Sequence, residues 1–231
     1  MKVEIWSDVV CPWCWIGKRR FEEALAGFQH REQVQVVWRS FELDSSAPAE
    51  LPHGVAEHLA GKYGVSRREA EAMIDRMTQN AAQDGLDFRF DIARSGNTFD
   101  AHRLLHLAAE RGRQGELKER LFAAYLSQGR PIGDHGTLLA VATEAGLDAA
   151  EVRDVLESER YAEAVRADEA EAAALGISGV PFFVVDRKYG VSGAQPAELL
   201  RQVLDRAWAE SAPLTVVGAA GAGCEGDSCA F

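Results

Sequence analysis

Cysteine is scarce in this sequence, and its scarcity limits what the protein can be. The 231 residues contain four cysteines, in two close pairs, Cys11/Cys14 and Cys224/Cys229. Two such pairs do not make the framework of structural disulfides that holds small secreted proteins together. Long apolar runs are missing too, because no stretch approaches the roughly 18 residues that a membrane-spanning helix needs.

The first residues also lack the pattern of a secretory leader. From Met1 to Trp6, apolar and polar side chains alternate, whereas a leader has a charged segment followed by an apolar core. We therefore expect a cytoplasmic protein. In that reducing compartment, close cysteine pairs are typical of redox or metal sites.

Basic charge is in short supply. Lys and Arg number 25 against 36 Asp and Glu, which gives a formal net charge of −11. A general nucleic-acid surface or a surface for anionic membranes needs a basic face, so we expect neither partner. The hydrophobic fraction of 47% is ordinary for a globular protein and is enough for a buried core. No pattern in the sequence indicates an oligomeric state.

The hydrophobic pattern predicts an α/β protein that is interrupted by helices. The expected elements, in chain order, are a strand at 3–6, a helix from Cys11, a strand at 33–41, a run of helices over 55–161, strands at 182–185 and 189–191, and a helix from Pro196. A capping box at Ser66 and Glu69 opens one of the inserted helices. The apolar positions Leu117, Leu121 and Phe122 mark the buried face of another.

This order divides the α/β part in two. We expect residues 1–44 and 161–212 to form one domain and residues 45–160 to form an inserted all-helical domain. The Glu- and Ala-rich stretch 163–174 is predicted to be a solvated helix face. Residues 213–231 are rich in Gly and Ala, which indicates a flexible C-terminal tail.

The spacing of Cys11 and Cys14 is typical of a dithiol in the first turn of a helix that follows a strand. Pro12 suits the first helical position, where a missing N–H costs nothing. Cys11 would be the N-cap residue, with its thiolate stabilised by free N–H groups and the helix dipole. We expect Cys11 to attack a disulfide and Cys14 to resolve the mixed disulfide. Half of a zinc site and two inert core cysteines are the alternatives that the local pattern leaves open.

Several further segments, together with this motif, resemble the thioredoxin-fold proteins of the DsbA superfamily, and most closely its FrnE-type branch. They are S-D-V-V-C-P-W-C-W-I-G at 7–17, W-R-S-F-E-L at 38–43, N-T at 97–98, A-H-R-L at 101–104, G-V-P-F-F at 179–183 and Y-G-V-S-G-A-Q at 189–195. The resemblance spans residues 5 to about 210. It implies a thioredoxin fold interrupted by a helical domain, in agreement with the predicted order of elements.

The resemblance also implies roles for single residues. Pro181 would follow a cis peptide bond and face the dithiol, although the local sequence alone fits an ordinary trans proline equally well. The backbone of Val180 would then be exposed to an extended substrate strand, and His102 would line the cleft between the domains. Trp13 stands where DsbA-like oxidants often carry His, which leaves the redox direction open. It forms either an apolar lip for substrate or an exposed aromatic with no particular role.

Other residues have competing interpretations. Cys224 and Cys229 resemble the second cysteine pair of some FrnE-type proteins, so we expect an auxiliary redox site, with incidental thiols as the alternative. His102 and His106 are four residues apart on a predicted helix, but the leucines around them favour packing, and we expect no metal site. Asp8 either caps its loop or modulates the cysteines as an acid.

We therefore expect a thiol–disulfide oxidoreductase that acts on protein or peptide substrates and needs no cofactor, with glutathione as a candidate redox partner. One alternative is a glutathione-dependent isomerase or transferase on the same fold, although such relatives typically carry Ser instead of the cysteine pair. A second is a holdase chaperone that uses the groove between the domains. A zinc protein that uses both cysteine pairs is a third.

Overall fold

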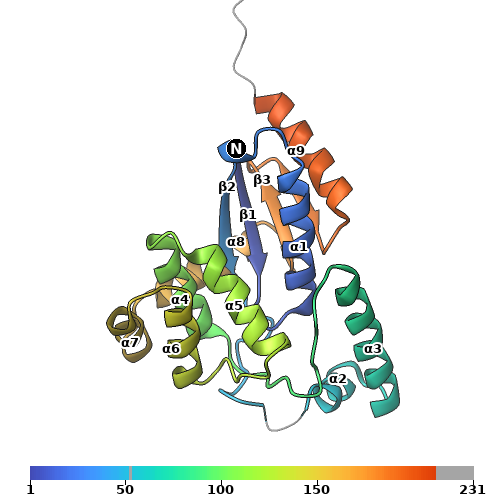
Figure 1. Ribbon diagram of the computed structural model, residues 1–231, viewed down its shortest axis with the longest axis vertical. Helices are drawn as coiled ribbons and strands as arrows, with labels where there is room; N and C mark the ends of the chain where they lie inside the picture. The colour runs from blue at the N-terminus through green and yellow to red at the C-terminus, as the bar shows by residue number, and fades with distance from the viewer. Residues whose placement is uncertain (52–53, 212–231) are drawn as a thin grey trace, which may run out of the picture.

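The computed structural model describes residues 1–51 and 54–211 (Figure 1). Its strands are β1 (Lys2–Ser7), β2 (Gln35–Ser40), β3 (Phe182–Val185) and β4 (Tyr189–Ser192). Its helices are α1 (Pro12–Ala26), α2 (Val55–Tyr63), α3 (Arg67–Gln83), α4 (Phe99–Glu110), α5 (Gln114–Leu126), α6 (His135–Glu144), α7 (Ala149–Glu157), α8 (Ala162–Ala174) and α9 (Ala197–Ser211). The strand predicted at 33–41 begins later, because residues 31–33 form a 3₁₀ turn.

The sheet is mixed, in the order β2-β1-β3-β4, with β1 at its centre. Ile5 of β1 lies opposite Trp38 in the parallel pairing with β2 and opposite Phe183 in the antiparallel pairing with β3. Because side chains alternate along a strand, Val3 and Ile5 pack in the cluster with α1 and α9, while Trp6 packs on the other face against α8. Helices therefore cover both faces of the sheet.

The helices α2 to α7 interrupt this α/β part between β2 and α8. Figure 1 shows them beyond the carboxyl end of β1, with α2 and α3 on one side and α4 to α7 on the other. The arrangement is a thioredoxin fold with a helical insertion, as predicted.

Trp15 of α1 joins the two parts through packing. Its ring stacks between Phe88 and Phe122, with centroid distances of 5.7 Å and 5.9 Å. Its indole N–H donates to the Glu119 carboxylate at 3.1 Å. The start of α1 and helices α4 to α7 share one apolar cluster, so the inserted helices are built directly onto the helix that carries the dithiol.

The local predictions within the insertion are confirmed. Ser66 and Glu69 form a reciprocal capping box at the start of α3, with the Glu69 carboxylate accepting from the Ser66 N–H at 2.8 Å. Leu117, Leu121 and Phe122 are buried along one face of α5.

The prediction for residues 163–174 is wrong in part. Helix α8 covers this stretch, and it buries Val165, Asp168 and Ala172. The Asp168 carboxylate accepts hydrogen bonds from the Arg39 guanidinium at 2.8 Å and from the Ser40 N–H at 2.9 Å. A carboxylate with such partners can be buried, and composition alone does not reveal them.

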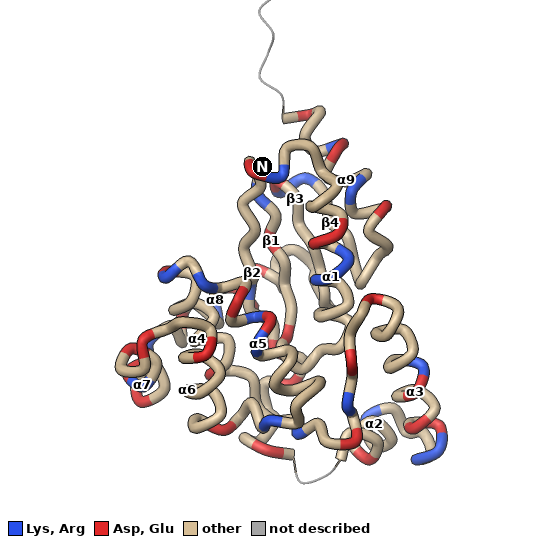
Figure 2. The backbone as a smooth tube through the Cα atoms, in the orientation of Figure 1, with Lys and Arg blue, Asp and Glu red and all other residues tan. Residues whose placement is uncertain are grey.

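Figure 2 shows Lys and Arg distributed over many elements of the described chain, so they are not gathered on one of them. Within the sheet, the buried Glu4 carboxylate is held by Lys2, Arg39 and Arg187. Across residues 1–51 and 54–211, we find no helix that is both long enough and apolar enough to cross a membrane.

Gly17 allows α1 to approach Pro181 closely. A Cβ added at Gly17 would lie 2.8 Å from Pro181 Cγ, whereas one added at Gly61 in α2 would have no neighbour within 4 Å. We expect Gly17→Ala to lower the free energy of unfolding by about 1–3 kcal/mol through overpacking. The matched Gly61→Ala change should leave it equal or raise it by up to about 1 kcal/mol, because Ala favours a helix interior. Urea unfolding of both variants measures the difference, and equal stabilities would show that Pro181 moves aside without cost.

Candidate functional site

The Cys11/Cys14 dithiol lies at the amino end of α1, just beyond the carboxyl end of β1. Cys11 is the N-cap residue, with an extended backbone (φ −86°, ψ 112°), and Pro12 follows in the first turn. The Cys11 N–H donates to the Asp8 carbonyl at 3.2 Å, and the Cys14 N–H donates to the Cys11 carbonyl at 3.0 Å. The predicted N-cap position is confirmed, and it places the Cys11 sulfur in the positive field of the helix start.

The two sulfurs differ in burial. Both cysteines are free thiols; Cys14 is fully buried, whereas Cys11 keeps 5% of its surface and lines a pocket. Burial raises the pKa of the Cys14 thiol well above its ordinary value, and the neighbouring Cys11 sulfur raises it further. Cys11 is therefore the sulfur that a substrate can reach, and Cys14 lies behind it as a protonated thiol.

Val180 and Pro181 lie beside the dithiol. The peptide bond between them is cis, as the resemblance implies. The Cys11 thiol donates to the Val180 carbonyl at 3.7 Å, and the Pro181 carbonyl accepts from the Gly193 N–H at 2.8 Å. The structure thus brings a segment about 170 residues further along the chain against the start of α1.

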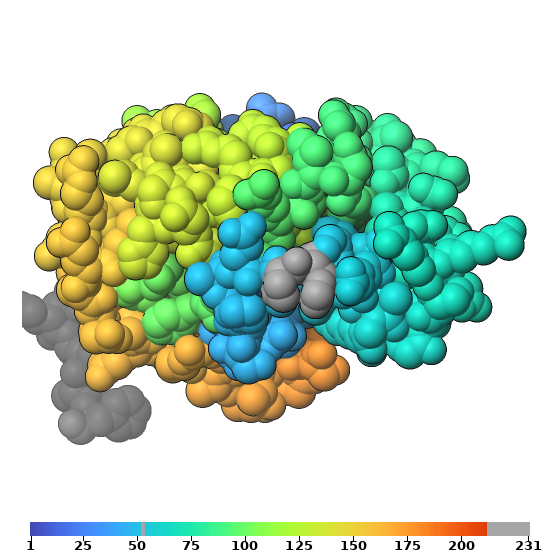
Figure 3. Space-filling view, turned by 90° about the horizontal axis from the view of Figure 1, so that it is seen from below, coloured from blue at the N-terminus to red at the C-terminus, as the bar shows by residue number. Residues whose placement is uncertain are grey.

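A pocket of about 390 Å³ opens beside Cys11. Figure 3 shows the surface at this end of the molecule, where the light-blue segment that follows β2 lies between the orange segment around β3 and the inserted helices. The lining comes from the start of α1, from α2 and α3, from the segment before α4, and from Gly179 and Val180. The pocket is therefore formed jointly by the α/β part and the insertion.

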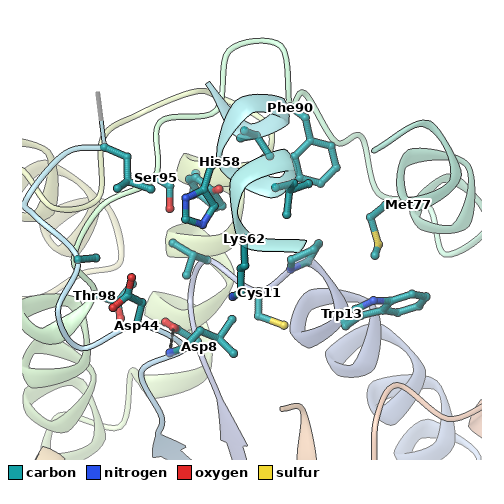
Figure 4. A pocket seen from close by; sticks show the side chains of 18 of the residues that line it. Asp8, Cys11, Trp13, Asp44, His58, Lys62, Met77, Phe90, Ser95 and Thr98 are labelled. Atoms are coloured by element: carbon teal, nitrogen blue, oxygen red, sulfur yellow. Dashed lines mark hydrogen bonds between the residues drawn. The ribbon is translucent and has the colours of Figure 1, made fainter. Parts of the chain in front are cut away.

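The pocket wall is mostly apolar. Trp13, which is 39% exposed, lines the pocket on the α1 side, and Met77 and Phe90 lie across from it (Figure 4). His58 and Lys62 of α2 add basic groups above Cys11. Thioether and aromatic side chains adapt to varied apolar groups, so the wall suits an apolar substrate segment with an acidic group nearby.

His102 does not line this pocket, which corrects the expectation for that residue. Its side chain is fully buried on α4, where its Nε2 lies 3.3 Å from Oδ1 of Asp8. The other Asp8 oxygen accepts from the Leu43 N–H at 2.8 Å. Asp8 thus connects the segment after β2 to the loop before Cys11 through hydrogen bonds. These contacts correspond to the first of the two interpretations of Asp8, in which it caps its loop.

The protonation states of this pair follow from its burial. Burial lowers the pKa of His102, and the hydrogen bond to Asp8 only partly opposes the effect. For Asp8, burial acts to raise the pKa, but the His102 contact and the Leu43 N–H outweigh it and bring the pKa below its ordinary value. Asp8 is therefore an anion held by a neutral imidazole, close to the dithiol.

Lys118 of α5 is a residue that the sequence interpretation missed. Its side chain is fully buried, and its ammonium donates to the Ser7 carbonyl at 3.3 Å. Burial lowers the pKa of Lys118 to about 8. No pattern in the sequence singles it out, because Lys118 adjoins the apolar stripe of α5 at a position where an exposed lysine is ordinary.

The remaining candidates do not form a metal site within the described ranges, where no cluster of three His, Cys, Asp or Glu side chains occurs. His106 contacts the Ser40 hydroxyl at 3.1 Å and the Asp168 carboxylate at 3.2 Å. Cys224 and Cys229 lie outside the described residues, so their redox role stays a prediction.

Comparison with known proteins places this geometry among related structures. The chain is 50% identical to a solved structure described as probable DsbA oxidoreductase SCO1869 from Streptomyces coelicolor, with a TM-score of 0.88 and coverage of 98% of this chain and 97% of that one. It is 29% identical over 185 residues to the uncharacterized protein YwbO of Bacillus subtilis (strain 168), covering 79% of this chain and 86% of that protein.

A more distant structure has the same fold. The cytosolic disulfide reductase DsbM from Pseudomonas aeruginosa is 16% identical, with a TM-score of 0.65 and coverage of 91% of this chain and 100% of that one, and it has also been solved with GSH. The model of the DSBA-like thioredoxin domain matches residues 2–205, nearly all of the described chain. Because of this match, the chain belongs to the family of DSBA-like thioredoxin domains, a family that includes disulfide oxidoreductases.

Proposed function

We propose that this protein exchanges disulfides with protein or peptide substrates through Cys11 and Cys14. The observation that carries the proposal is the difference in burial between the two sulfurs. Cys11 lies at a helix start and reaches the pocket, whereas Cys14 is enclosed behind it. An attacking sulfur must meet the substrate, and a resolving sulfur only has to meet its partner cysteine.

Exchange would proceed in two displacements. The Cys11 thiolate attacks one sulfur of a substrate disulfide; a Cys11–substrate bond forms, and the other substrate sulfur leaves as a thiolate. Cys14 then loses its proton and attacks the Cys11 sulfur, so that the Cys11–Cys14 disulfide forms and the second substrate thiolate leaves. Two electrons pass from the dithiol to the substrate, and the reverse sequence oxidises a substrate dithiol.

The shape and lining of the pocket favour an extended peptide with an apolar side chain near its disulfide. An extended substrate segment would lie along the Val180 backbone, with an apolar side chain between Trp13 and Met77. Glutathione is a candidate redox partner, because Lys62 and His58 can receive its carboxylates above Cys11. We also propose a cytoplasmic location, in line with the cytosolic reductase among the structural relatives.

Cys14→Ser should trap substrates. With the resolving sulfur gone, the mixed disulfide on Cys11 cannot be displaced internally, so covalent complexes with peptide disulfides should accumulate. Non-reducing electrophoresis and mass spectrometry of the adduct measure this. Cys11→Ser is the matched control, and it should form no such complex, because Cys14 is fully buried. Adducts on Cys14 in place of Cys11 would reverse the assignment of the two roles.

The pocket wall should select apolar substrates. Met77→Glu places a charge in the wall, and we expect kcat/KM for a peptide disulfide with a Leu or Phe beside the cysteine to fall about fivefold or more, which corresponds to about 1 kcal/mol. A peptide with Ser in that place should lose much less. Leu199→Glu is the control, because it places the same charge on α9, at an exposed apolar position outside the pocket. Equal losses for both peptides would mean that they bind elsewhere.

A further inference from the structure

Within the described part of the chain, Lys118 has no acidic partner of its own. Its side chain is completely buried, and its ammonium donates a hydrogen bond to the Ser7 carbonyl; among residues 1–51 and 54–211 it forms no ion pair with a carboxylate. Lys18, another buried lysine, contrasts with it, because its ammonium lies 2.6 Å from Glu22 and 2.7 Å from Glu119. A buried lysine without a carboxylate is costly, so its retention needs an explanation.

One peptide group connects Lys118 with Cys14. The carbonyl of this group belongs to Ser7 and accepts from the Lys118 ammonium. Its N–H belongs to Asp8, and the partial positive charge of this N–H lowers the pKa of the Cys14 thiol against the larger effect of burial. Hydrogen bonds in series polarise one another, so a positive charge at Lys118 strengthens the donor that faces Cys14.

The charges around Lys118 act in both directions. Burial has the largest effect and lowers the pKa of Lys118; the Asp8 carboxylate and, when ionised, the thiols of Cys14 and Cys11 raise it, and Lys18 lowers it. With a pKa of about 8, Lys118 is mainly an ammonium at pH 7. His102, a further titratable group that interacts with Lys118, is held neutral by burial. The ammonium also lies over the rings of Phe122 at 5.2 Å and Trp38 at 5.8 Å.

We propose that Lys118 is the buried counter-charge of the Cys14 thiolate in the resolving step, which rests on the proposed function. Cys14 must become an anion in an enclosed site where Asp8 is already negative. A second uncompensated anion there would be strongly disfavoured. Lys118 compensates it, directly through its charge and indirectly through the Ser7–Asp8 peptide group.

The resolving step balances with Lys118 unchanged. The Cys14 thiol gives its proton to solvent, and the thiolate forms opposite the ammonium. The thiolate attacks the Cys11 sulfur of the mixed disulfide, the Cys11–substrate bond breaks, and its electron pair leaves on the substrate sulfur, which takes up a proton. In the oxidising direction, Cys14 is the leaving thiolate, and Lys118 stabilises it in the same way. Lys118 acts through its positive charge alone: it stabilises the Cys14 thiolate and transfers no proton.

The test is the decay of the mixed disulfide in Lys118→Met protein. The adduct of Cys11 with a peptide thiol is formed, and its decay is followed by acid quench and mass spectrometry from pH 6 to pH 10. Below the pKa of Cys14, the rate follows the thiolate fraction, so losing a nearby positive charge should displace the profile upward by about one pH unit. At pH 7 the decay should slow about tenfold, while adduct formation at Cys11 should change less than about threefold.

Two further variants separate charge from packing. Lys118→Arg keeps the positive charge and should restore most of the decay rate at pH 7. Lys18→Met removes a buried lysine that already has carboxylate partners, and it should leave the decay profile within about twofold of wild type. Superimposable profiles for wild type and Lys118→Met would overturn the proposal. So would an equal slowing of both steps at every pH, which indicates a structural role.

A measurement on the wild-type chain does not depend on how the variants fold. The chain has five lysines, Lys2, Lys18, Lys62, Lys118 and Lys188, so NMR with labelled lysine can follow the Lys118 side chain. Its titration midpoint should be higher by at least about half a pH unit in the reduced protein than in the disulfide form, which has no thiolates. Equal midpoints would contradict the proposal. If Cys11 forms no mixed disulfide at all, the proposed function fails instead, so the two failures are distinguishable.

Discussion

The packing of Trp15 is the interaction on which the site depends. Its ring lies between Phe88 and Phe122 of the inserted helical part, while its backbone belongs to the first turns of α1, next to Cys14. A buried bulky aromatic that stacks on two other rings leaves α1 little freedom to rotate or slide. The position of the dithiol, the depth of Cys14 and the approach of Lys118 from α5 all follow from this contact.

Cys11 and Cys14 are only three positions apart at the start of α1, yet they differ in exposure and in what surrounds their sulfurs. At the N-cap, Cys11 faces the pocket and the positive end of the helix; one turn later, Cys14 faces the core. Burial then raises the pKa of Cys14 well above its ordinary value. The compensation comes from the Ser7–Asp8 peptide group and from Lys118, which belong to other elements.

Local patterns made the fold and the dithiol predictable from the sequence. The alternation in β1, the Cys-Pro-Trp-Cys motif and the Ser66–Glu69 capping box each depend on residues within one element. The errors concern contacts between distant segments. His102 is buried because it meets Asp8, 94 residues earlier, and Lys118 reaches a carbonyl 111 residues away. No spacing rule connects such partners: the family resemblance placed His102 in the cleft, and nothing in the sequence distinguished Lys118 from an ordinary surface lysine.

The helices that form the pocket wall are much less buried than the dithiol that they face. Helix α2 contains no buried residue, and α3 buries only Ala70 and Ala81, whereas Cys14, Trp15 and the residues around them are closed in the core. Substitutions at exposed positions usually change stability by less than about 0.5 kcal/mol. Substitutions in α2 and α3 can therefore accumulate at little cost to folding. The range of substrates can then change during evolution while the buried dithiol and its chemistry stay the same.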